Sequence, residues 1–159
     1  MPETGDEAPD FTAPLANGDI EEFTLSDRLE DEAPIVLAFF PGAFTSVCTT
    51  EMCEFQDRLA AFDDVDASVY GVSRDSPFTL NEFRAQNELE FGLISDLNEE
   101  IIDDYGIEMD FDDLGVYGVA KRSVFVVDDD GEITYEWVSD DPGVEPDYDD
   151  VEAAVEDAA

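Results

Sequence analysis

One continuous apolar stretch constrains the fold of this 159-residue chain more than any other feature. The segment from Ile35 to Phe40 carries no polar side chain, and Pro41-Gly42 ends it. An apolar run of this length, bounded by turn residues, is typical of a strand that is buried on both faces of a parallel or mixed sheet. We therefore expect a central strand here, covered by helices on both sides.

Strand and helix patterns alternate along the rest of the chain. Further strands are expected at residues 67–73, 91–95, 123–127 and 133–138, and helices at 46–62, from 76 onward, at 96–106 and at 148–156. The dipeptides Asn17-Gly18 and Asp130-Gly131 favour tight hairpins. This alternation predicts an α/β fold with a central mixed β-sheet, helices on both faces and an N-terminal β-hairpin. No linker or repeat interrupts it, so we expect one domain over residues 1–159.

Charge excludes several classes of partner. The chain holds 44 Asp and Glu against 6 Lys and Arg, a formal net charge of −38, and no histidine. Without clustered cations we expect no binding of nucleic acid and no docking to an anionic membrane. The absence of histidine excludes histidine bases and histidine-ligated metals. Acids spread over the whole chain resemble the proteins of salt-in halophiles; a mesophilic acidic surface or an acidic partner-binding face is the alternative.

The chain shows no signal for membrane insertion or export. No apolar run approaches the ~20 residues of a membrane span, and residues 1–7 hold neither basic residues nor an apolar signal core. We therefore expect a cytoplasmic protein. Thiols are normally reduced in that compartment, so Cys48 and Cys53 are expected to be reactive rather than structural.

The most informative segment follows the apolar strand. Pro41-Gly42 leads into a helix whose first turn contains Cys48. The free N–H groups of that turn carry about half a positive charge, which favours the nucleophilic thiolate. The Thr45 hydroxyl, three residues earlier, can face the sulfur or a substrate oxygen, and Pro41 can fix the turn and shield the sulfur. The alternative is a buried core cysteine, because Cys48 shares an apolar stripe with Met52 and Phe55.

Several motifs, in order along the chain, carry a family resemblance. Pro41-x-x-x-Thr45-x-x-Cys48 resembles the signature of the peroxiredoxins. Further segments similar to that family are Ala8 to Phe11, Thr24 to Asp27, Gly71 to Ser76, Phe91 to Asp96 and Arg122 to Gly131. Together they extend the resemblance from about Glu7 to Val151, nearly the whole chain.

The resemblance implies a thioredoxin-like fold and a thiol-dependent peroxidase for hydrogen peroxide or organic hydroperoxides, with no cofactor and no metal. The peroxidatic role falls on Cys48, which would become a sulfenic acid. Thr45 and Arg122 map to the groups that hydrogen-bond the peroxide and the thiolate, and Pro41 maps to the signature proline. Such donors would stabilise negative charge on the leaving oxygen. A thioredoxin-like protein or a low-molecular-weight thiol would be the reductant, and a homodimer is implied by resemblance alone.

Cys53 is the candidate resolving thiol. The Cys-x₄-Cys pair resembles the bacterioferritin-comigratory-protein (PrxQ-type) branch, whereas residues 78–96 look more like the AhpE-type branch, which usually lacks the second cysteine. In an intact helix, Cα atoms five residues apart lie roughly 8.7 Å from each other, and a disulfide needs about 4.4–6.8 Å. A Cys48–Cys53 bond therefore requires the first helical turn to unwind; the alternative is that Cys53 is inert.

Two other functions stay open. A thioredoxin-fold disulfide oxidoreductase would move electrons between protein thiols, although the two cysteines lack the Cys-x-x-Cys spacing. A redox-sensing interaction protein would not turn over substrate. Rapid peroxide consumption that depends on Cys48 separates the peroxidase from both.

Overall fold

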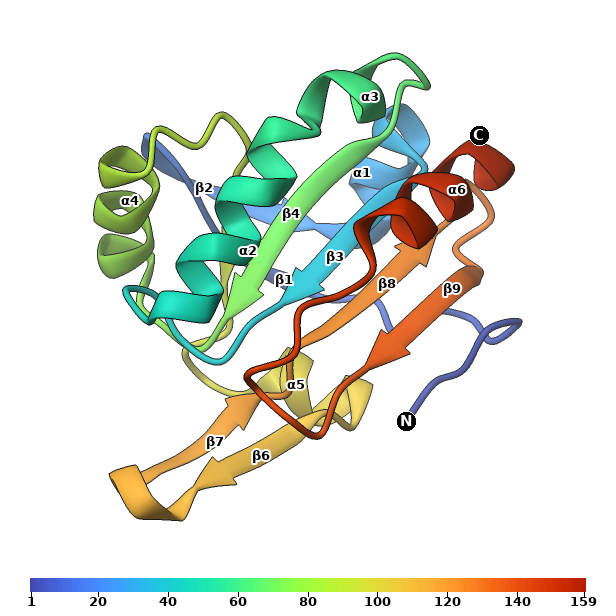
Figure 1. Cartoon of the computed structure of the whole chain (residues 1–159). Helices are drawn as coiled ribbons and strands as arrows, with labels where there is room; N and C mark the ends of the chain where they lie inside the picture. Colours follow the sequence, from blue (N-terminus) through green and yellow to red (C-terminus); the bar gives the residue numbers. More distant parts are fainter.

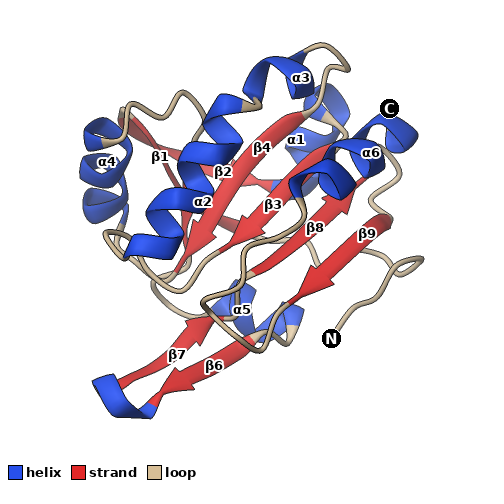
Figure 2. Cartoon of the chain, viewed as in Figure 1, coloured by secondary structure: helices blue, strands red, loops and turns tan.

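The computed structural model describes residues 1–159 and is built around a seven-stranded mixed sheet (Figures 1 and 2). Its strand order is β2-β1-β5-β4-β3-β8-β9. The strands are β1 (Thr12–Asn17), β2 (Asp19–Thr24), β3 (Ile35–Phe39), β4 (Ser68–Ser73), β5 (Leu93–Ser95), β8 (Ser123–Val127) and β9 (Ile133–Val138). β3, β4 and β5 run parallel, whereas β1 and β8 pair antiparallel with them. The predicted mixed sheet and N-terminal hairpin are confirmed.

Helices cover both faces of this sheet (Figure 1). The helices are α1 (Leu25–Glu32), α2 (Ser46–Asp57), α3 (Leu59–Asp63), α4 (Pro77–Gln86), α5 (Glu100–Tyr105) and α6 (Tyr148–Ala158). α1 and α5 pack on one face, and α2, α3, α4 and α6 pack on the other. Side chains of β3 alternate between the two cores, with Leu37 on the α5 side and Ala38 on the α2 side, and all five β3 residues are inaccessible to solvent. The two-sided burial predicted for this apolar run is confirmed.

The helix predicted at residues 46–62 is in fact two helices. Arg58 (φ −98°, ψ 2°) separates α2 from α3. Its guanidinium binds Glu54 on α2 and both Asp149 and Glu152 on α6, which connects the end of α2 to the last helix. Apolar residues continue with the same period on both sides of the break, so periodicity alone could not detect it.

The helix predicted from Asp96 begins four residues later. α5 starts at Glu100, and Glu99 before it has a left-handed backbone (φ 62°). The Asp96 carboxylate still accepts hydrogen bonds from the N–H groups of Ile101 (3.0 Å) and Ile102 (2.8 Å). The sequence Asp96-x-x-Glu99 would suit a capping box, but the Glu99 carboxylate pairs with Arg74 at 2.7 Å instead.

Two features have no counterpart in the sequence prediction. One is α1, in which only Leu25 and Leu29 are buried. The other is a small antiparallel hairpin of β6 (Glu108–Phe111), the 3₁₀ turn η1 (Asp112–Leu114) and β7 (Val116–Ala120), which projects from the main sheet (Figure 1). Both are short and largely exposed, so neither presents the regular apolar period that indicates a packed element.

A glycine allows α2 to lie close against the sheet. A Cβ atom on Gly71 of β4 would lie 2.7 Å from Leu93 Cδ2, 3.0 Å from Met52 Sδ and 3.1 Å from Phe40 Cε1. A contact of 2.7 Å is closer than real Cβ atoms come to a neighbour, so a larger residue would force Leu93, and to a smaller extent Met52 and Phe40, to move. Gly71 therefore leaves the space in which these three side chains pack.

Candidate active site

Cys48 lies in the first turn of α2, just after the loop that connects β3 to this helix. The strand ends at Phe39, the chain turns at Pro41 and Gly42, and α2 begins at Ser46 with Thr45 as its N-cap. The first backbone hydrogen bond of α2 runs from Thr49 N–H to Thr45 C=O (2.9 Å), so the earlier N–H groups have no partner within the helix. Cys48 sits in this first turn and is only 1% exposed. The predicted thiol at a helix N-terminus is therefore present in the fold.

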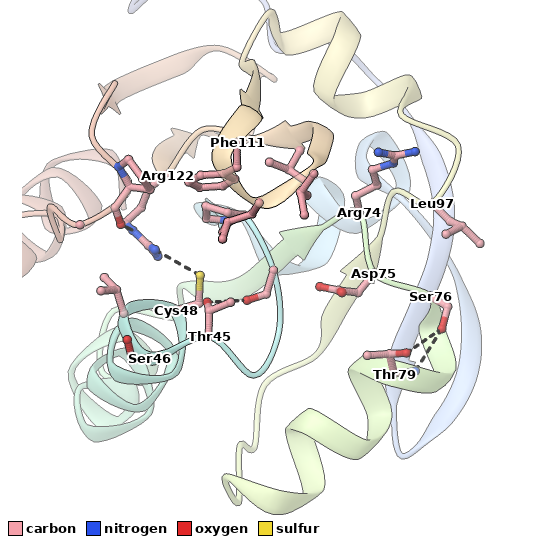
Figure 3. A pocket seen from close by; sticks show the side chains of 18 residues that line it. Thr45, Ser46, Cys48, Arg74, Asp75, Ser76, Thr79, Leu97, Phe111 and Arg122 are labelled. Carbon is pink, nitrogen blue, oxygen red and sulfur yellow. Dashed lines mark hydrogen bonds between the residues drawn. The ribbon is translucent and has the colours of Figure 1, made fainter.

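Arg122 approaches Cys48 from the segment that connects β7 to β8. It stands between β7 and β8, and the antiparallel pairing of Ser123 with Phe39 places it beside the end of β3. Its Nη2 donates to Cys48 Sγ at 3.1 Å, and its Nε donates to the Pro142 carbonyl at 3.1 Å (Figure 3). Arg122 is buried, with 1% of the residue exposed.

Glu51 is the second buried group that contacts the Arg122 guanidinium. Arg122 Nη1 donates to Glu51 Oε1 at 2.7 Å, and Glu51 is inaccessible to solvent. Burial raises the pKa of Glu51 to about 7, although Arg122 opposes this shift. Burial by itself would lower the pKa of Arg122, but Glu51 and Cys48 beside it raise that pKa. Arg122 therefore stays a cation that is shared between a carboxyl group and the sulfur.

Glu51 is not among the site residues predicted from the sequence. An acid three residues after Cys48 on the apolar face of an amphipathic helix was the available signal. Charged residues are almost never fully buried unless they are paired. An acid on a buried stripe therefore predicts a buried cation opposite it, which here is Arg122.

Thr45 and Pro41 both lie near the Cys48 thiol. Pro41 is buried, and both residues line the same cavity as Cys48. The Thr45 hydroxyl donates to the Gly42 carbonyl at 2.8 Å, and no hydrogen bond joins it to the sulfur. Of the two directions expected for this hydroxyl, toward the sulfur or toward a substrate oxygen, the structure does not show the first, and the hydroxyl does not cap α2 either.

Cys53 lies on the same helix but outside this arrangement. Both cysteines are free, and both belong to the continuous helix α2. The Cys53 thiol donates to Asn87 Oδ1 at 3.8 Å, and burial, aided by Asp57, raises its pKa. Cys53 does not line the cavity that Cys48 lines.

A cavity of about 750 Å³ opens onto the thiol (Figure 3). Its polar lining includes Cys48, Arg122 and Thr45, the groups already described. Its apolar lining comes largely from the β6–β7 hairpin, through Phe111 and Leu114 among others. The volume greatly exceeds that of a hydrogen peroxide molecule, so larger molecules also fit at the thiol.

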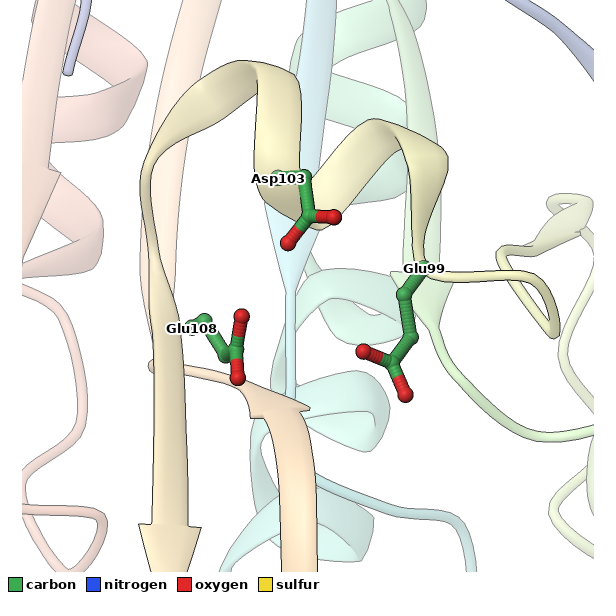
Figure 4. A group of neighbouring side chains, drawn as sticks. All are labelled: Glu99, Asp103 and Glu108. Atoms are coloured by element: carbon green, nitrogen blue, oxygen red, sulfur yellow. The ribbon is translucent and has the colours of Figure 1, made fainter.

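A cluster of carboxylates lies away from the thiol. Figure 4 shows Glu99, Asp103 and Glu108, whose oxygen atoms come within 4.8 Å of one another. A hydrogen bond with Asp103 raises the pKa of Glu108. Glu99 already binds Arg74 at the cavity, so one member of the cluster has a protein cation as its partner.

The fold and the enclosed thiol define a class of protein. A cysteine at a helix N-terminus, beside a buried guanidinium on a mixed α/β sheet, is suited to nucleophilic thiol chemistry. The model of the AhpC/TSA family matches residues 4–136. The chain therefore belongs to the AhpC/TSA family, the peroxiredoxins.

Individual proteins agree with this assignment. The chain is 37% identical over 143 residues to "2-cysteine peroxiredoxin, chloroplastic" of Chattonella marina var. antiqua, covering 85% of this chain and 70% of that protein. It is 34% identical over 146 residues to "Peroxiredoxin-2" of Bos taurus, covering 87% and 70% respectively. The crystal structure of peroxidoxin BcpB from Mycobacterium tuberculosis superimposes with a TM-score of 0.83 at 30% identity, over 98% of this chain and 97% of that one. The chain is thus a thiol-dependent peroxidase, which implies a peroxide as oxidant and a thiol as reductant.

Proposed function

We propose that Cys48 is the peroxidatic residue of this enzyme. The observation that carries the proposal is the 3.1 Å hydrogen bond from Arg122 Nη2 to Cys48 Sγ in the first turn of α2. The N-terminal turn of α2 and a permanent cation meet at this sulfur, and both stabilise negative charge that develops beside it during the reaction. Cys53 has neither feature, and burial raises its pKa.

The first step is a displacement at the peroxide bond. The Cys48 thiolate attacks one oxygen of R–O–O–H, an S–O bond forms and the O–O bond breaks. The sulfur is oxidised to a sulfenic acid, and the peroxide leaves as an alkoxide or hydroxide that takes up a proton. Negative charge moves from sulfur to the leaving oxygen, and Arg122 supplies a cation beside that path.

Thr45 and Pro41 contribute to this step through their positions beside the sulfur: Thr45 as a hydrogen-bond acceptor and Pro41 as a cover. Because the Thr45 hydroxyl proton is directed at the Gly42 carbonyl, its oxygen is free to accept a hydrogen bond from the peroxide. Pro41 is buried against the cavity and has no N–H group, so it covers the sulfur without offering a competing donor.

Cys53 is proposed to resolve the sulfenic acid. Its thiol would displace water from Cys48–SOH to give the Cys48–Cys53 disulfide, which an external thiol then reduces. Both residues sit on the intact helix α2, so this bond requires the first turns of α2 to unwind. The two free thiols support a reduced starting state.

Further parts of the proposal concern setting and partners. Hydrogen peroxide and organic hydroperoxides are the proposed substrates, because the cavity of about 750 Å³ admits both. The proposed reductant is a thioredoxin-like protein or a small thiol. No helix of the structure is both long enough and apolar enough to cross a bilayer. We also propose that residues 1–159 form one domain, that the protein is cytoplasmic and that it forms a homodimer.

Rapid mixing of the reduced protein with hydrogen peroxide tests the proposal. Second-order peroxide consumption should be abolished by Cys48→Ser and retained for the first turnover by Cys53→Ser. Peptide mapping after one equivalent of peroxide should show the Cys48–Cys53 disulfide. Stable Cys48 sulfenic acid with Cys53 still free would contradict the role of Cys53, and consumption that survives Cys48→Ser would contradict the whole assignment.

A further inference from the structure

The loop between β3 and α2, residues 42–45, carries the active cysteine into place. Phe44 in this loop has a left-handed backbone (φ 67°) that non-glycine residues rarely adopt, and its side chain is 50% exposed. Its ring meets the edge of Phe83 at 5.3 Å between centroids. A strained backbone of this kind persists only when the surroundings hold it, so the ties of this loop to the rest of the protein matter.

Asp75 provides such a tie. It lies between β4 and α4, and its Oδ2 accepts hydrogen bonds from the Ala43 N–H (2.8 Å) and from Ser73 Oγ (2.7 Å). Its own carbonyl accepts a bond from Ser95 Oγ at 2.6 Å. Ser73 and Ser95 belong to neighbouring strands and are buried. The carboxylate is therefore anchored to the sheet on one side and holds the loop on the other.

We propose that Asp75 is a positioning residue that locks the 42–45 loop, and with it the first turn of α2, in the folded conformation in which Cys48 meets Arg122. The same lock restrains the unwinding that a Cys48–Cys53 bond requires. This inference rests on the roles proposed above for the two cysteines. Asp75 itself need not touch the reacting atoms.

The lock determines the fate of the sulfenic acid. In the unwound state, Cys53 displaces water and forms the disulfide. In the folded state, a second peroxide oxidises Cys48–SO⁻ to the sulfinate –SO₂⁻ and leaves as an alcohol or water. Loss of one net hydrogen bond shifts the folded–unwound equilibrium by about two- to tenfold. Removing the Asp75 carboxylate should therefore speed disulfide formation by about that factor while the initial attack on peroxide does not accelerate.

Asp75→Ala removes the lock, and the chain supplies a matched control. The Asp10 carboxylate accepts bonds from the Ser26 N–H (2.9 Å) and Ser26 Oγ (2.8 Å), the same two donor types, and does not line the cavity. Asp10→Ala thus removes hydrogen bonds from the same two donor types elsewhere, at a more exposed position. Asp75→Asn keeps one acceptor oxygen but loses the negative charge that strengthens both hydrogen bonds. It should loosen the lock less than Asp75→Ala, and it provides a folded variant in which exchange at 43–51 should still rise if the alanine change proves too destabilising.

Amide hydrogen exchange of the reduced proteins is the first measurement. In Asp75→Ala, exchange at residues 43–51 should accelerate by about two- to tenfold, whereas Asp10→Ala should leave that segment unchanged. Unchanged exchange at 43–51 in both Asp75 variants overturns the inference. Equal acceleration throughout the chain also overturns it, because Asp75 would then support only global stability.

Kinetics on the same variants give the second measurement. In Asp75→Ala, the disulfide should form faster, and more peroxide should be needed to accumulate sulfinate, relative to wild type and Asp10→Ala. Disulfide formation that slows together with peroxide attack overturns the inference. If wild-type Cys48 is oxidised without forming a disulfide, the role of Cys53 fails, and exchange at 43–51 decides the role of Asp75. If wild-type Cys48 does not react with peroxide, the proposed function fails instead.

Discussion

Replacing Arg122 by methionine separates the chemical role of its cation from its structural role. The guanidinium donates to Cys48 Sγ, Glu51 Oε1 and the Pro142 carbonyl at 3.1, 2.7 and 3.1 Å. Methionine matches the aliphatic stem of arginine but lacks the guanidinium, so the change removes these donors and the charge and leaves an apolar side chain in the buried space. Two effects follow, one on stability and one on the rate of reaction with peroxide.

The structural effect comes from Glu51, which is inaccessible to solvent and has only Arg122 as an ion-pair partner. Removing one member of a buried pair costs about 3–5 kcal/mol, against a total stability of about 5–15 kcal/mol for a typical domain. The chemical effect is the loss of one aimed donor beside the reacting sulfur, about 10²- to 10³-fold in rate.

The double variant Arg122→Met with Glu51→Gln distinguishes the two effects. It removes both charges, so no uncompensated carboxylate is left buried, and most of the lost stability should return. The rate should not return with it, because the donor to Cys48 is still absent. Urea unfolding followed through the fluorescence of Trp137, the single tryptophan, measures stability. Rapid mixing with hydrogen peroxide measures the second-order rate, and both measurements use one fixed, high salt concentration.

Recovery of the peroxide rate together with stability in the double variant would refute this reasoning. Arg122 would then act only by supporting the fold around Glu51. A decrease of less than about threefold in the peroxide rate of Arg122→Met would also refute the chemical role of Arg122, since the loss of one charge-assisted hydrogen bond should slow the reaction by more than that. Glu51→Gln alone is the control for the second substitution.

Three further predictions concern stability. Burial raises the pKa of Glu51 from 4.5 to about 7, so the folded state keeps a proton that the unfolded state releases. The free energy of unfolding should therefore fall by up to about 3 kcal/mol as pH rises through this range, and the difference from Glu51→Gln in urea titrations at several pH values isolates it. Gly71→Ala should destabilise by about 1–3 kcal/mol, because its Cβ would meet Leu93 at 2.7 Å; an unchanged urea midpoint would contradict the steric argument. Asp96→Ala should weaken the start of α5 by about 1 kcal/mol, seen as faster amide exchange at Ile101 than in Asp10→Ala.

Local patterns in the sequence predicted much of the fold and part of the site. The apolar run at 35–40, the Asn17-Gly18 turn and the helix expected from residue 76 each depend on near neighbours in the chain, and each appears in the structure. The position of Cys48 in a first helical turn was predictable for the same reason. The break at Arg58 was not, because its cause is a contact with α6 about ninety residues later.

The sequence by itself determined the alternation of strands and helices and the placement of Cys48 at a helix start, because these follow from the spacing of side chains within a few residues. Only the tertiary structure decided that Arg122, 74 residues away, donates to that sulfur and that Glu51 is the buried partner of the same guanidinium. The register of β8 against β3 sets this meeting, since it places Ser123 opposite Phe39. Contacts of this kind depend on how strands align across the sheet, a quantity that no local spacing encodes.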